Sequence, residues 1–372
     1  MPSFITSLFS PTATGRRTLM NKQKSTVFIS LEANHNQRPK HPSAPQPTTI
    51  PSDLPQPMTM ETLCRNYQSI VRTLGIYYPV AYQFARLLGK GQQGQVFLGL
   101  RQGARGCITE NAIKLYSPAL YATPEDYWTD MGRIAAQVSR MQRIQCPNIV
   151  ARYSYQETYG IGYVEMEAID GVDLSRLLSR RYLERAMPRC SQGEWVTFTQ
   201  TVFRLEQNRM RLQPGVVVYL LRGILRGLER LHDMGFLHFD LKPGNVMVDR
   251  LGSVKLIDFG RAVMVNERVS FLFGSPLYMA PETHRREGGS PQSDLFSVGL
   301  IALQLLVGHP IPDGPDISEA DLLKVKMGIA DQLETILPPY VSENADLVGI
   351  LRKLLAPNPA DRYASAKDAN VG

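Results

Sequence analysis

The stretch His238-Phe239-Asp240-Leu241-Lys242-Pro243-Gly244-Asn245 is followed, thirteen residues after its end, by Asp258-Phe259-Gly260. Short apolar segments typical of strands separate the two groups, so two acids and an amide are predicted on loops between strands. Carboxylate and amide oxygens suit Mg²⁺, and a carboxylate can accept a hydroxyl proton. We therefore predict that Asn245 and Asp258 bind a metal ion and that Asp240 acts as a base. Ordinary Asp/Asn-rich turns explain either group alone, but explain the pair at this spacing poorly.

A glycine-rich segment, Gly89-Lys90-Gly91-Gln92-Gln93-Gly94-Gln95-Val96, lies within a region, Phe84 to Leu100, that has the pattern of two strands around a turn. Glycine lets backbone N–H groups approach phosphate oxygens without a Cβ in the way. A plain hairpin is the alternative, because glycine-rich turns are common. A dinucleotide-binding turn would open a helix here, whereas a strand pattern follows. The order favours a hairpin that covers phosphates.

Lys114 comes twenty residues after Gly94, on the short apolar segment Asn111–Tyr116 that is predicted to be a strand. A lysine between apolar neighbours in a strand is usually an edge residue that points to water. Its place after the glycine-rich hairpin favours another interpretation, in which its ammonium group is a point charge for nucleotide phosphates.

The next segment carries clear signals for the start of a helix. Thr123 takes the N-cap position, Pro124 the first helical position and Asp126 the third, which are residue types preferred there. We expect this helix to run to about Gln145 and to stop before Pro147.

Strand patterns dominate the first half of the chain and helical patterns the second, from Leu174 onward, with the strongest at Val216–His232 and Leu295–Val307. This order predicts an α+β protein of two lobes: a small β-rich N-lobe over residues 67–169 and a large helical C-lobe over residues 170–372. The uncharged run Leu295–Val307 has 13 residues, too few to span a bilayer. It predicts a buried core helix, and no transmembrane segment is expected.

Residues 1–66 are predicted to be a disordered tail rich in proline, serine and threonine. The first 60 residues hold nine of the 26 prolines, and the stretch Arg38 to Pro57 shows no helix or strand period. A passive tail is one interpretation. The other is an address, because an acid-poor start rich in serine and threonine resembles organellar transit peptides and the export signals of bacterial effectors.

Charge and cysteine content exclude several other classes of protein. The net charge is +7, of which residues 1–60 carry +4 and the remainder of the chain only +3. A body this close to neutral argues against a nucleic-acid partner. The four cysteines form no CxxC pair, so a reducing compartment, the cytoplasm, is expected.

Taken in order, these motifs resemble the eukaryotic-type protein kinase superfamily over roughly residues 80–366. Further motifs of that family follow the first ones along the chain: Gly274-Ser275-Pro276, Ala280-Pro281-Glu282 and Asp294-Leu295-Phe296-Ser297-Val298-Gly299. The resemblance implies the two-lobed kinase fold. It also implies a buried ion pair between Glu282 and Arg362, and an Asp294 that holds the backbone of the catalytic loop.

The resemblance further implies the cofactors and the site. ATP and Mg²⁺ are the expected cofactors, Asp240, Lys114 and Lys242 form the expected catalytic set, and Asn245 and Asp258 are the expected metal ligands. The nucleotide is expected to contact Leu88, Gly89, Lys90, Gly91, Gln92, Gly94, Val96, Ala112, Lys114, Glu167, Ile169, Asp173 and Met247.

The activity implied is transfer of phosphate from ATP to serine or threonine hydroxyls of proteins, because Lys242 and Ser275 resemble the serine/threonine versions of their loops. The alternative is a pseudokinase, a scaffold that binds nucleotide or partners with little transfer. A small-molecule phosphotransferase is disfavoured, because Gly-Ser-Pro and Ala-Pro-Glu shape a segment that docks peptides.

Two residues depart from the family pattern. Phe239 stands where most members have arginine, and Gln137 stands where a helix glutamate pairs with the strand lysine, here Lys114. We expect Gln137 to accept a hydrogen bond from this lysine and to hold its helix inward more weakly than glutamate would. Asp130, seven residues earlier, is expected to be a poor substitute.

An arginine-rich insertion over residues 180–214 is longer than the family's usual link at this place. Aromatic and aliphatic residues interleave with its arginines, which predicts a helix over Glu194 to Leu212 with one apolar face. A helix packed on the large lobe is one interpretation. A docking surface for an acidic partner or an anionic membrane is the other.

Overall fold

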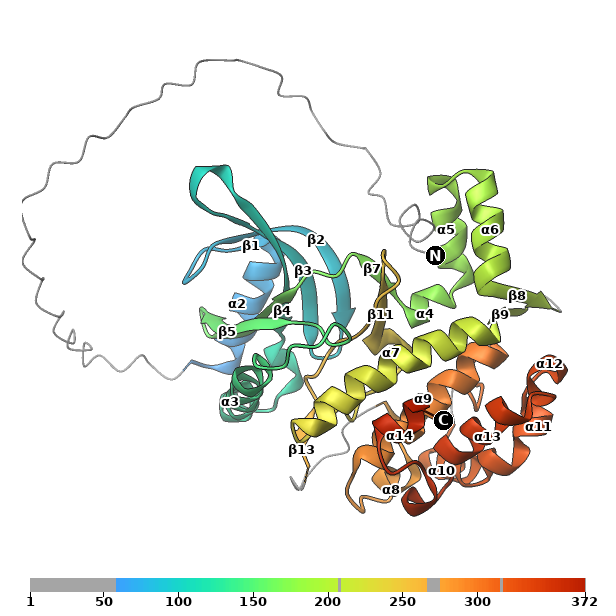
Figure 1. Ribbon diagram of the computed structural model, residues 1–372. Coiled ribbons are helices and arrows are strands. Elements are labelled where there is room, and N and C mark those ends of the chain that lie inside the picture. The colour runs from blue at the N-terminus through green and yellow to red at the C-terminus, as the bar shows by residue number, and fades with distance from the viewer. Residues whose placement is uncertain (1–57, 207–208, 266–274, 315–316, 372) are drawn as a thin grey trace, which may run out of the picture.

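Six antiparallel strands form the sheet of the smaller lobe, in the order β1-β2-β3-β4-β6-β5 (Figure 1). The computed structural model describes residues 58–371, apart from 207–208, 266–274 and 315–316. The strands are β1 (Gly75–Ile76), β2 (Tyr82–Gly91), β3 (Gly94–Gln102), β4 (Ile108–Tyr116), β5 (Arg152–Thr158) and β6 (Ile161–Glu167). Phe84 stacks on Phe97 with ring centroids 4.5 Å apart, within the core of this lobe. The two strands predicted around the glycine-rich turn are therefore confirmed.

Helix α3 (Pro124–Met141) packs against β5 and begins as the sequence predicts. The Thr123 hydroxyl accepts a hydrogen bond from the backbone N of Asp126 at 3.1 Å. The helix ends at Met141 rather than at Gln145, because the chain turns there toward the larger lobe. Ile149 then forms a β-bridge with Leu256 of that lobe.

Helix α2 (Met60–Thr73) corrects the predicted end of the tail. The disorder expected for residues 1–66 is wrong for 60–66, which form the first half of this helix. Leu63 and Ile70 lie seven residues apart on one face, and both are buried in the core of the smaller lobe. Residues 1–57, with the targeting role predicted for them, lie outside the described residues.

The larger lobe is mostly helical and is organised around two long helices, α7 (Pro214–Asp233) and α9 (Pro291–Val307). These are the helices predicted at 216–232 and 295–307, and α9 is buried along most of its length. The other helices are α4 (Leu174–Leu177), α5 (Arg180–Ala186), α6 (Gln192–Val202), α8 (Pro281–His284), α10 (Glu319–Gly328), α11 (Leu333–Ile336), α12 (Pro339–Ser342), α13 (Ala345–Leu354) and α14 (Ala366–Val371). Among the described residues, no helix combines the length and the apolar character needed to cross a bilayer.

Short strands lie between the helices of the larger lobe: β7 (Gly171–Asp173), β8 (Phe203–Glu206), β9 (Arg209–Leu212), β10 (Phe236–Leu237), β11 (Val246–Asp249), β12 (Val254–Leu256) and β13 (Val263–Met264). Strands β12, β11 and β7 form one small antiparallel sheet, and β10 pairs with β13. Figure 1 shows β7 and β11 on the side of the larger lobe that faces the sheet of the smaller lobe.

The arginine-rich insertion does not form the single helix predicted over Glu194 to Leu212. Helix α6 stops at Val202, and β8 and β9 follow as a two-stranded ribbon. The ribbon places Phe203 opposite Leu212, and both side chains are buried in the core of the larger lobe. Burial of these two residues against the lobe outweighs continuation of the helix.

Two arginines of this insertion contact the large lobe rather than a free surface. The Arg211 Nε donates to the carbonyl oxygen of Val307 at 3.2 Å. The guanidinium carbon of Arg204 lies 3.9 Å from the centre of the Tyr340 ring. Part of the insertion is therefore packed on the large lobe, while Arg181 and Arg185 of α5 remain exposed.

Candidate active site

Strand pairing brings Asn245 and Asp258 to one end of the β11–β12 hairpin. Val246 pairs with Leu256, and the backbone N of Ile257 donates to the carbonyl oxygen of Asn245 at 2.9 Å. Asp258 is the next residue along the chain. The two predicted metal ligands are therefore held close together by the register of a hairpin, although they are thirteen residues apart in sequence.

The Asp240 carboxylate is buried and surrounded by donors. It accepts hydrogen bonds from Lys242 Nζ at 2.9 Å, from Ser275 Oγ at 3.1 Å and from Asn245 Nδ2 at 3.1 Å. Three donors fix the orientation of the carboxylate. The structure thus joins three predicted site residues, Asp240, Lys242 and Asn245, with Ser275 of the later Gly-Ser-Pro motif.

The loop that carries Asp240 is fixed by Asp294, which lies on α9. Its two carboxylate oxygens accept hydrogen bonds from the backbone N–H groups of His238, at 2.8 Å, and Phe239, at 3.0 Å. Burial by itself would raise the pKa of Asp294, but the hydrogen bond and charge of His232 outweigh burial and leave this pKa below its usual range. A permanent carboxylate therefore holds the loop.

Lys114 and Asp258 form an ion pair, with Nζ 2.5 Å from Oδ1. Burial favours the neutral form of both groups. Their mutual attraction outweighs burial, so the pKa of Lys114 is raised and the pKa of Asp258 lies well below its usual range. Both groups stay charged at neutral pH. Lys114 Nζ also donates to Gln93 Oε1 at 2.9 Å, a contact from the glycine-rich turn that the sequence did not predict.

The free oxygens of Asn245 and Asp258 fit a Mg²⁺ ion. Within the described chain, Asn245 makes its side-chain hydrogen bonds through Nδ2, which donates to Asp240. Asp258 makes its own through Oδ1, which accepts from Lys114 and from the backbone N of Gly260. Asn245 Oδ1 and Asp258 Oδ2 are therefore the side-chain oxygens left for a metal ion, and amide and carboxylate oxygens are the ligands that Mg²⁺ prefers.

The glycine-rich hairpin lies beside the strand that carries Lys114 in the same sheet. Gly89 pairs with Val96, and Val96 in turn pairs with Lys114 on β4. A Cβ atom at Gly94 would lie 1.9 Å from the carbonyl oxygen of Leu115, and its φ is +144°, so only glycine fits this position. The hairpin holds the predicted nucleotide residues Leu88, Gly89, Lys90, Gly91, Gln92, Gly94 and Val96 together.

The remaining predicted nucleotide residues line the junction of the two lobes. Ala112 pairs with Met166 at the end of the smaller sheet, and Met247 of β11 pairs with Asp173 of β7. The backbone of Ile169, which follows β6, takes part in no hydrogen bond within the described chain. The contact between this backbone and a nucleotide base stays a prediction.

Two of these residues have side-chain partners of their own. The Glu167 carboxylate pairs with Lys255 Nζ at 2.8 Å, and its backbone N donates to the carbonyl oxygen of Ala151 at 2.9 Å. The contact between Glu167 and a nucleotide stays a prediction. The Asp173 carboxylate caps α4 through the backbone N of Arg176 at 3.0 Å and pairs with Arg176 Nε at 3.3 Å. The contact between Asp173 and a nucleotide stays a prediction.

Gln137 does not face Lys114 as the sequence predicts. Its Nε2 donates to the carbonyl oxygens of Phe259, at 2.7 Å, and Ala262, at 2.8 Å. Its Oε1 accepts from Arg152 Nη1 at 3.3 Å. The expected bond to Lys114 is therefore replaced by an anchor to the backbone around Asp258-Phe259-Gly260.

Arg152, which the sequence reasoning missed, is a buried cation beside this anchor. Its side chain is 8% exposed, and its guanidinium carbon lies 4.8 Å from the centre of the Phe259 ring. Burial lowers the pKa of Arg152, yet an arginine remains protonated in proteins. Its position directly after the apolar run Ile149-Val150-Ala151 was the signal available in the sequence.

The family described as "Protein kinase domain" matches residues 82–370. The chain belongs to this family. It is 30% identical over 297 residues to the serine/threonine-protein kinase Pkn1 of Myxococcus xanthus, a match covering 77% of this chain and 36% of that one. It is 28% identical to the human ribosomal protein S6 kinase alpha-1, covering 78% and 34%, and to the serine/threonine-protein kinase PknE of Mycobacterium bovis, covering 78% and 45%. The chain thus spans less than half the length of these relatives.

The ion pair implied by the kinase resemblance is present. Arg362 Nη1 lies 2.8 Å from Glu282 Oε1, and Arg362 Nη2 lies 2.8 Å from Glu282 Oε2. Both residues are buried. The geometry is bidentate, which is the strong form of this interaction. It ties the end of the segment after Asp258 to the last part of the kinase domain.

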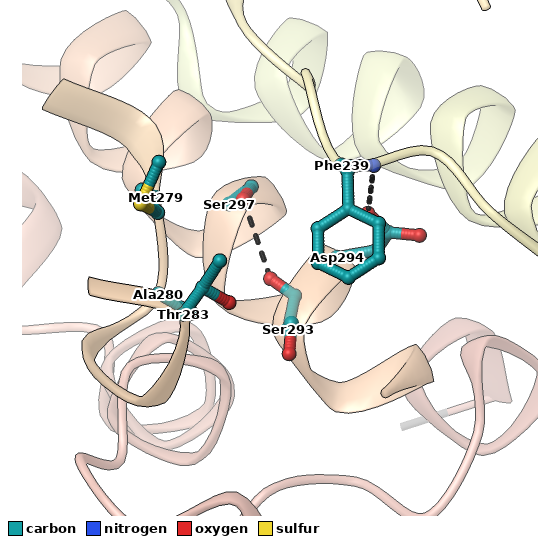
Figure 2. A pocket seen from close by; sticks show the side chains of 7 residues that line it. All are labelled: Phe239, Met279, Ala280, Thr283, Ser293, Asp294 and Ser297. Carbon is teal, nitrogen blue, oxygen red and sulfur yellow. Dashed lines mark hydrogen bonds between the residues drawn. The ribbon is translucent and has the colours of Figure 1, made fainter. Parts of the chain in front are cut away.

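Phe239, the departure from the kinase pattern, packs its ring into the larger lobe. Figure 2 shows the ring beside Asp294, in a small cavity that it shares with Met279, Ala280 and Thr283. A Cβ atom built on Gly289 would lie 2.0 Å from this ring. Phe239 therefore fills a place that only glycine leaves open.

Proposed function

We propose that this kinase domain transfers the γ-phosphoryl group of ATP to serine or threonine hydroxyls of protein substrates. The observation that carries the proposal is the Asp240 carboxylate, held by Lys242, Ser275 and Asn245 beside the Lys114–Asp258 ion pair. A fixed base next to a fixed positive charge is what in-line transfer between two oxygen atoms needs.

The nucleotide side of the reaction rests on the smaller lobe. Lys114 supplies a positive charge for the phosphates, and the β2–β3 hairpin supplies backbone N–H groups above it. The Gln93 side-chain oxygen accepts a hydrogen bond from Lys114 Nζ, and the phosphates of a nucleotide would compete with it for this ammonium group. Asn245 Oδ1 and Asp258 Oδ2 would hold Mg²⁺. When bound, Mg²⁺ neutralises charge on the phosphates.

The acceptor side rests on Asp240. Its carboxylate orients the hydroxyl of the protein substrate and takes the proton as the new P–O bond forms, while the bond from the γ-phosphorus to the bridging oxygen breaks and ADP leaves. Lys242 Nζ lies 2.9 Å from Asp240 and 3.0 Å from Ser275 Oγ. This ammonium supplies charge on the acceptor side and links the base to the segment that docks the substrate.

A scaffold with little transfer is the second candidate, and the observation that favours it is Gln137. The helix that carries Gln137 bonds to the backbone near Asp258 rather than to Lys114. Among the described residues, the hydrogen bonds of Lys114 Nζ then go to Asp258 and Gln93.

Titration calorimetry with ATP and Mg²⁺, run beside a radiolabelled transfer assay on a degenerate serine/threonine peptide mixture, separates the two candidates. The proposed activity predicts binding together with labelled phosphoserine or phosphothreonine. Binding without any labelled peptide would favour the scaffold. Asp258→Asn should weaken the dependence of nucleotide binding on Mg²⁺, and Asp249→Asn, in an outlying turn, serves as its control.

The wider setting of the domain is also a proposal. A cytoplasmic location is expected from the scattered cysteines. We propose that an acidic partner docks on the arginine-rich insertion through Arg181 and Arg185, which are exposed. Replacing both by glutamate should abolish capture of an acidic peptide if the insertion docks such a partner, and should leave capture unchanged if it only packs on the lobe.

A further inference from the structure

Lys326 of α10 is a fully buried lysine, with 0% of its side chain exposed. Its Nζ donates to the carbonyl oxygen of Pro276 at 2.5 Å and to that of Met279 at 2.7 Å, and it lies 2.7 Å from His284 Nε2. His284 Nε2 also lies 2.9 Å from the carbonyl oxygen of Pro276, so the two backbone carbonyls are the acceptors of Lys326 whichever ring nitrogen of His284 carries the proton.

The segment that Lys326 holds leads directly to the base. Pro276 follows Ser275, whose Oγ donates to Asp240 Oδ1 at 3.1 Å and accepts from Lys242 Nζ at 3.0 Å. Residues 276–278 form one short turn of helix. Of the two carbonyls bound by Lys326, that of Pro276 belongs to the first residue of this turn and that of Met279 to the residue directly after it. Lys326 therefore fixes the backbone of the segment whose first side chain touches Asp240.

None of the three groups that contact Lys326 Nζ carries a negative charge, so the buried lysine has no ion-pair partner among them. Burial lowers the pKa of Lys326 to about 7, and burial and the nearby Lys326 lower the pKa of His284. Both effects favour the neutral form of His284. An aliphatic side chain would fill the same space without the cost of desolvating an ammonium group, so the two bonds to the carbonyl oxygens of Pro276 and Met279 are the gain that the lysine supplies.

We propose that Lys326 is a positioning residue that holds the segment Ser275–Met279 against Asp240 and thereby sets how well the protein substrate is held. The proposal deepens, and rests on, the proposed transfer to protein hydroxyls. Lys326 does not touch the nucleotide side, where Lys114, Asn245 and Asp258 lie. Its loss should therefore affect the peptide and spare ATP.

The test compares Lys326→Met, which keeps the length but removes the donors, with Lys324→Met on the exposed face of the same helix. Lys326→Met is expected to lower kcat/KM for a defined serine peptide by about tenfold to a hundredfold, chiefly through KM. The Kd for ATP should stay within about twofold of wild type. Equal peptide kinetics in both variants would overturn the proposal, and so would a parallel loss of ATP binding.

Hydrogen–deuterium exchange keeps the proposal testable apart from activity. Backbone amides of residues 275–284 should exchange faster in Lys326→Met than in Lys324→Met, while those of α9 stay protected. If Lys326→Met fails to fold, His284→Ala removes one of the three contacts of Lys326 Nζ and should give the same pattern more weakly. If Lys326→Met exchanges faster but the wild-type protein never phosphorylates peptides, the proposed function is contradicted and the positioning role is not. Unchanged exchange in Lys326→Met would contradict the positioning role alone.

Discussion

Gln137 Nε2 lies 2.7 Å from the carbonyl oxygen of Phe259. Helix α3 of the smaller lobe is thus bonded to the backbone that carries Asp258, a residue of the larger lobe. The bond is made by an uncharged amide acting as donor, and the Gln137 oxygen is taken by Arg152. Arg133 of α3 adds a bond from Nη2 to the carbonyl oxygen of Gly260 at 2.8 Å. The position of α3 therefore depends on hydrogen bonds to carbonyl oxygens of this backbone and not on an ion pair with Lys114.

Gln137→Glu should lower activity, because a carboxylate cannot donate to the carbonyl oxygens of Phe259 and Ala262. Loss of two hydrogen bonds of about 1 kcal/mol each corresponds to a drop in kcat of roughly tenfold or more. Gln142→Glu, which removes a single exposed bond to Tyr153, is the control. A Gln137→Glu protein as active as wild type, measured as initial rates of peptide phosphorylation, would show that this anchor is not needed.

The kinase is expected to be active without phosphorylation of the segment after Asp258. An arginine beside the base normally pairs with a phosphorylated residue of that segment, and Phe239 cannot. Phosphatase-treated protein and a Ser270→Ala variant should therefore phosphorylate peptide at the wild-type rate. Ser270 lies outside the described residues, so this prediction rests on Phe239 and the sequence. Loss of activity in both samples would contradict it.

Gly289→Ala should destabilise the larger lobe through contact with Phe239. Its new Cβ atom would lie 2.0 Å from the Phe239 ring, and such overpacking costs about 1–3 kcal/mol. Gly349→Ala, where a Cβ atom meets nothing within 4 Å, is the matched control. Adding Phe239→Ala to Gly289→Ala should remove most of the clash in a double-mutant cycle of unfolding free energies. Additive effects would show that the two residues are not coupled.

Glu282→Gln should cost about 3 kcal/mol of unfolding free energy at pH 7, because it leaves Arg362 buried without its partner. Burial raises the pKa of Glu282, but the hydrogen bond and charge of Arg362 outweigh burial, and this pKa lies below its usual range. The stability supplied by the carboxylate is therefore complete above the unfolded pKa, about 4.3, and is lost as pH falls through the lower folded pKa.

Urea unfolding of wild type and Glu282→Gln between pH 3 and pH 7 measures this dependence. The difference between the two proteins should be constant above about pH 5 and should shrink below about pH 4. Glu334→Gln removes an exposed partner of Arg352 and should change stability little at any pH. A difference in unfolding free energy between wild type and Glu282→Gln that grew as the pH fell would contradict the prediction.

Much of the site could be predicted from sequence because its residues sit at fixed distances from turns and strands. Thr123 caps its helix as predicted, since a cap needs only local residues. Asn245 and Asp258 meet because two short apolar segments pair. In each case the deciding interactions lie within a few residues of chain or within one hairpin.

The features that could not be predicted depend on contacts between residues far apart in the sequence, which a local sequence pattern does not show. Gln137 bonds to backbone carbonyls 122 and 125 residues away, and every residue has such a carbonyl. The buried role of Arg152 follows from its packing on Phe259. Helix α6 ends at Val202 because Phe203 and Leu212 gain burial against the large lobe as a ribbon, a tertiary effect that overrides local helical pattern.

The steady-state kcat of Asp240→Asn, relative to wild type and on the same serine peptide with Mg²⁺ and ATP, tests the central claim most directly. Asparagine keeps the size of the side chain but cannot take the proton. We expect a kcat at least about a hundredfold lower, with a Kd for ATP within about twofold of wild type. An Asp240→Asn protein that phosphorylates the peptide as fast as wild type would contradict the assignment of Asp240 as the base, and with it the proposed kinase site.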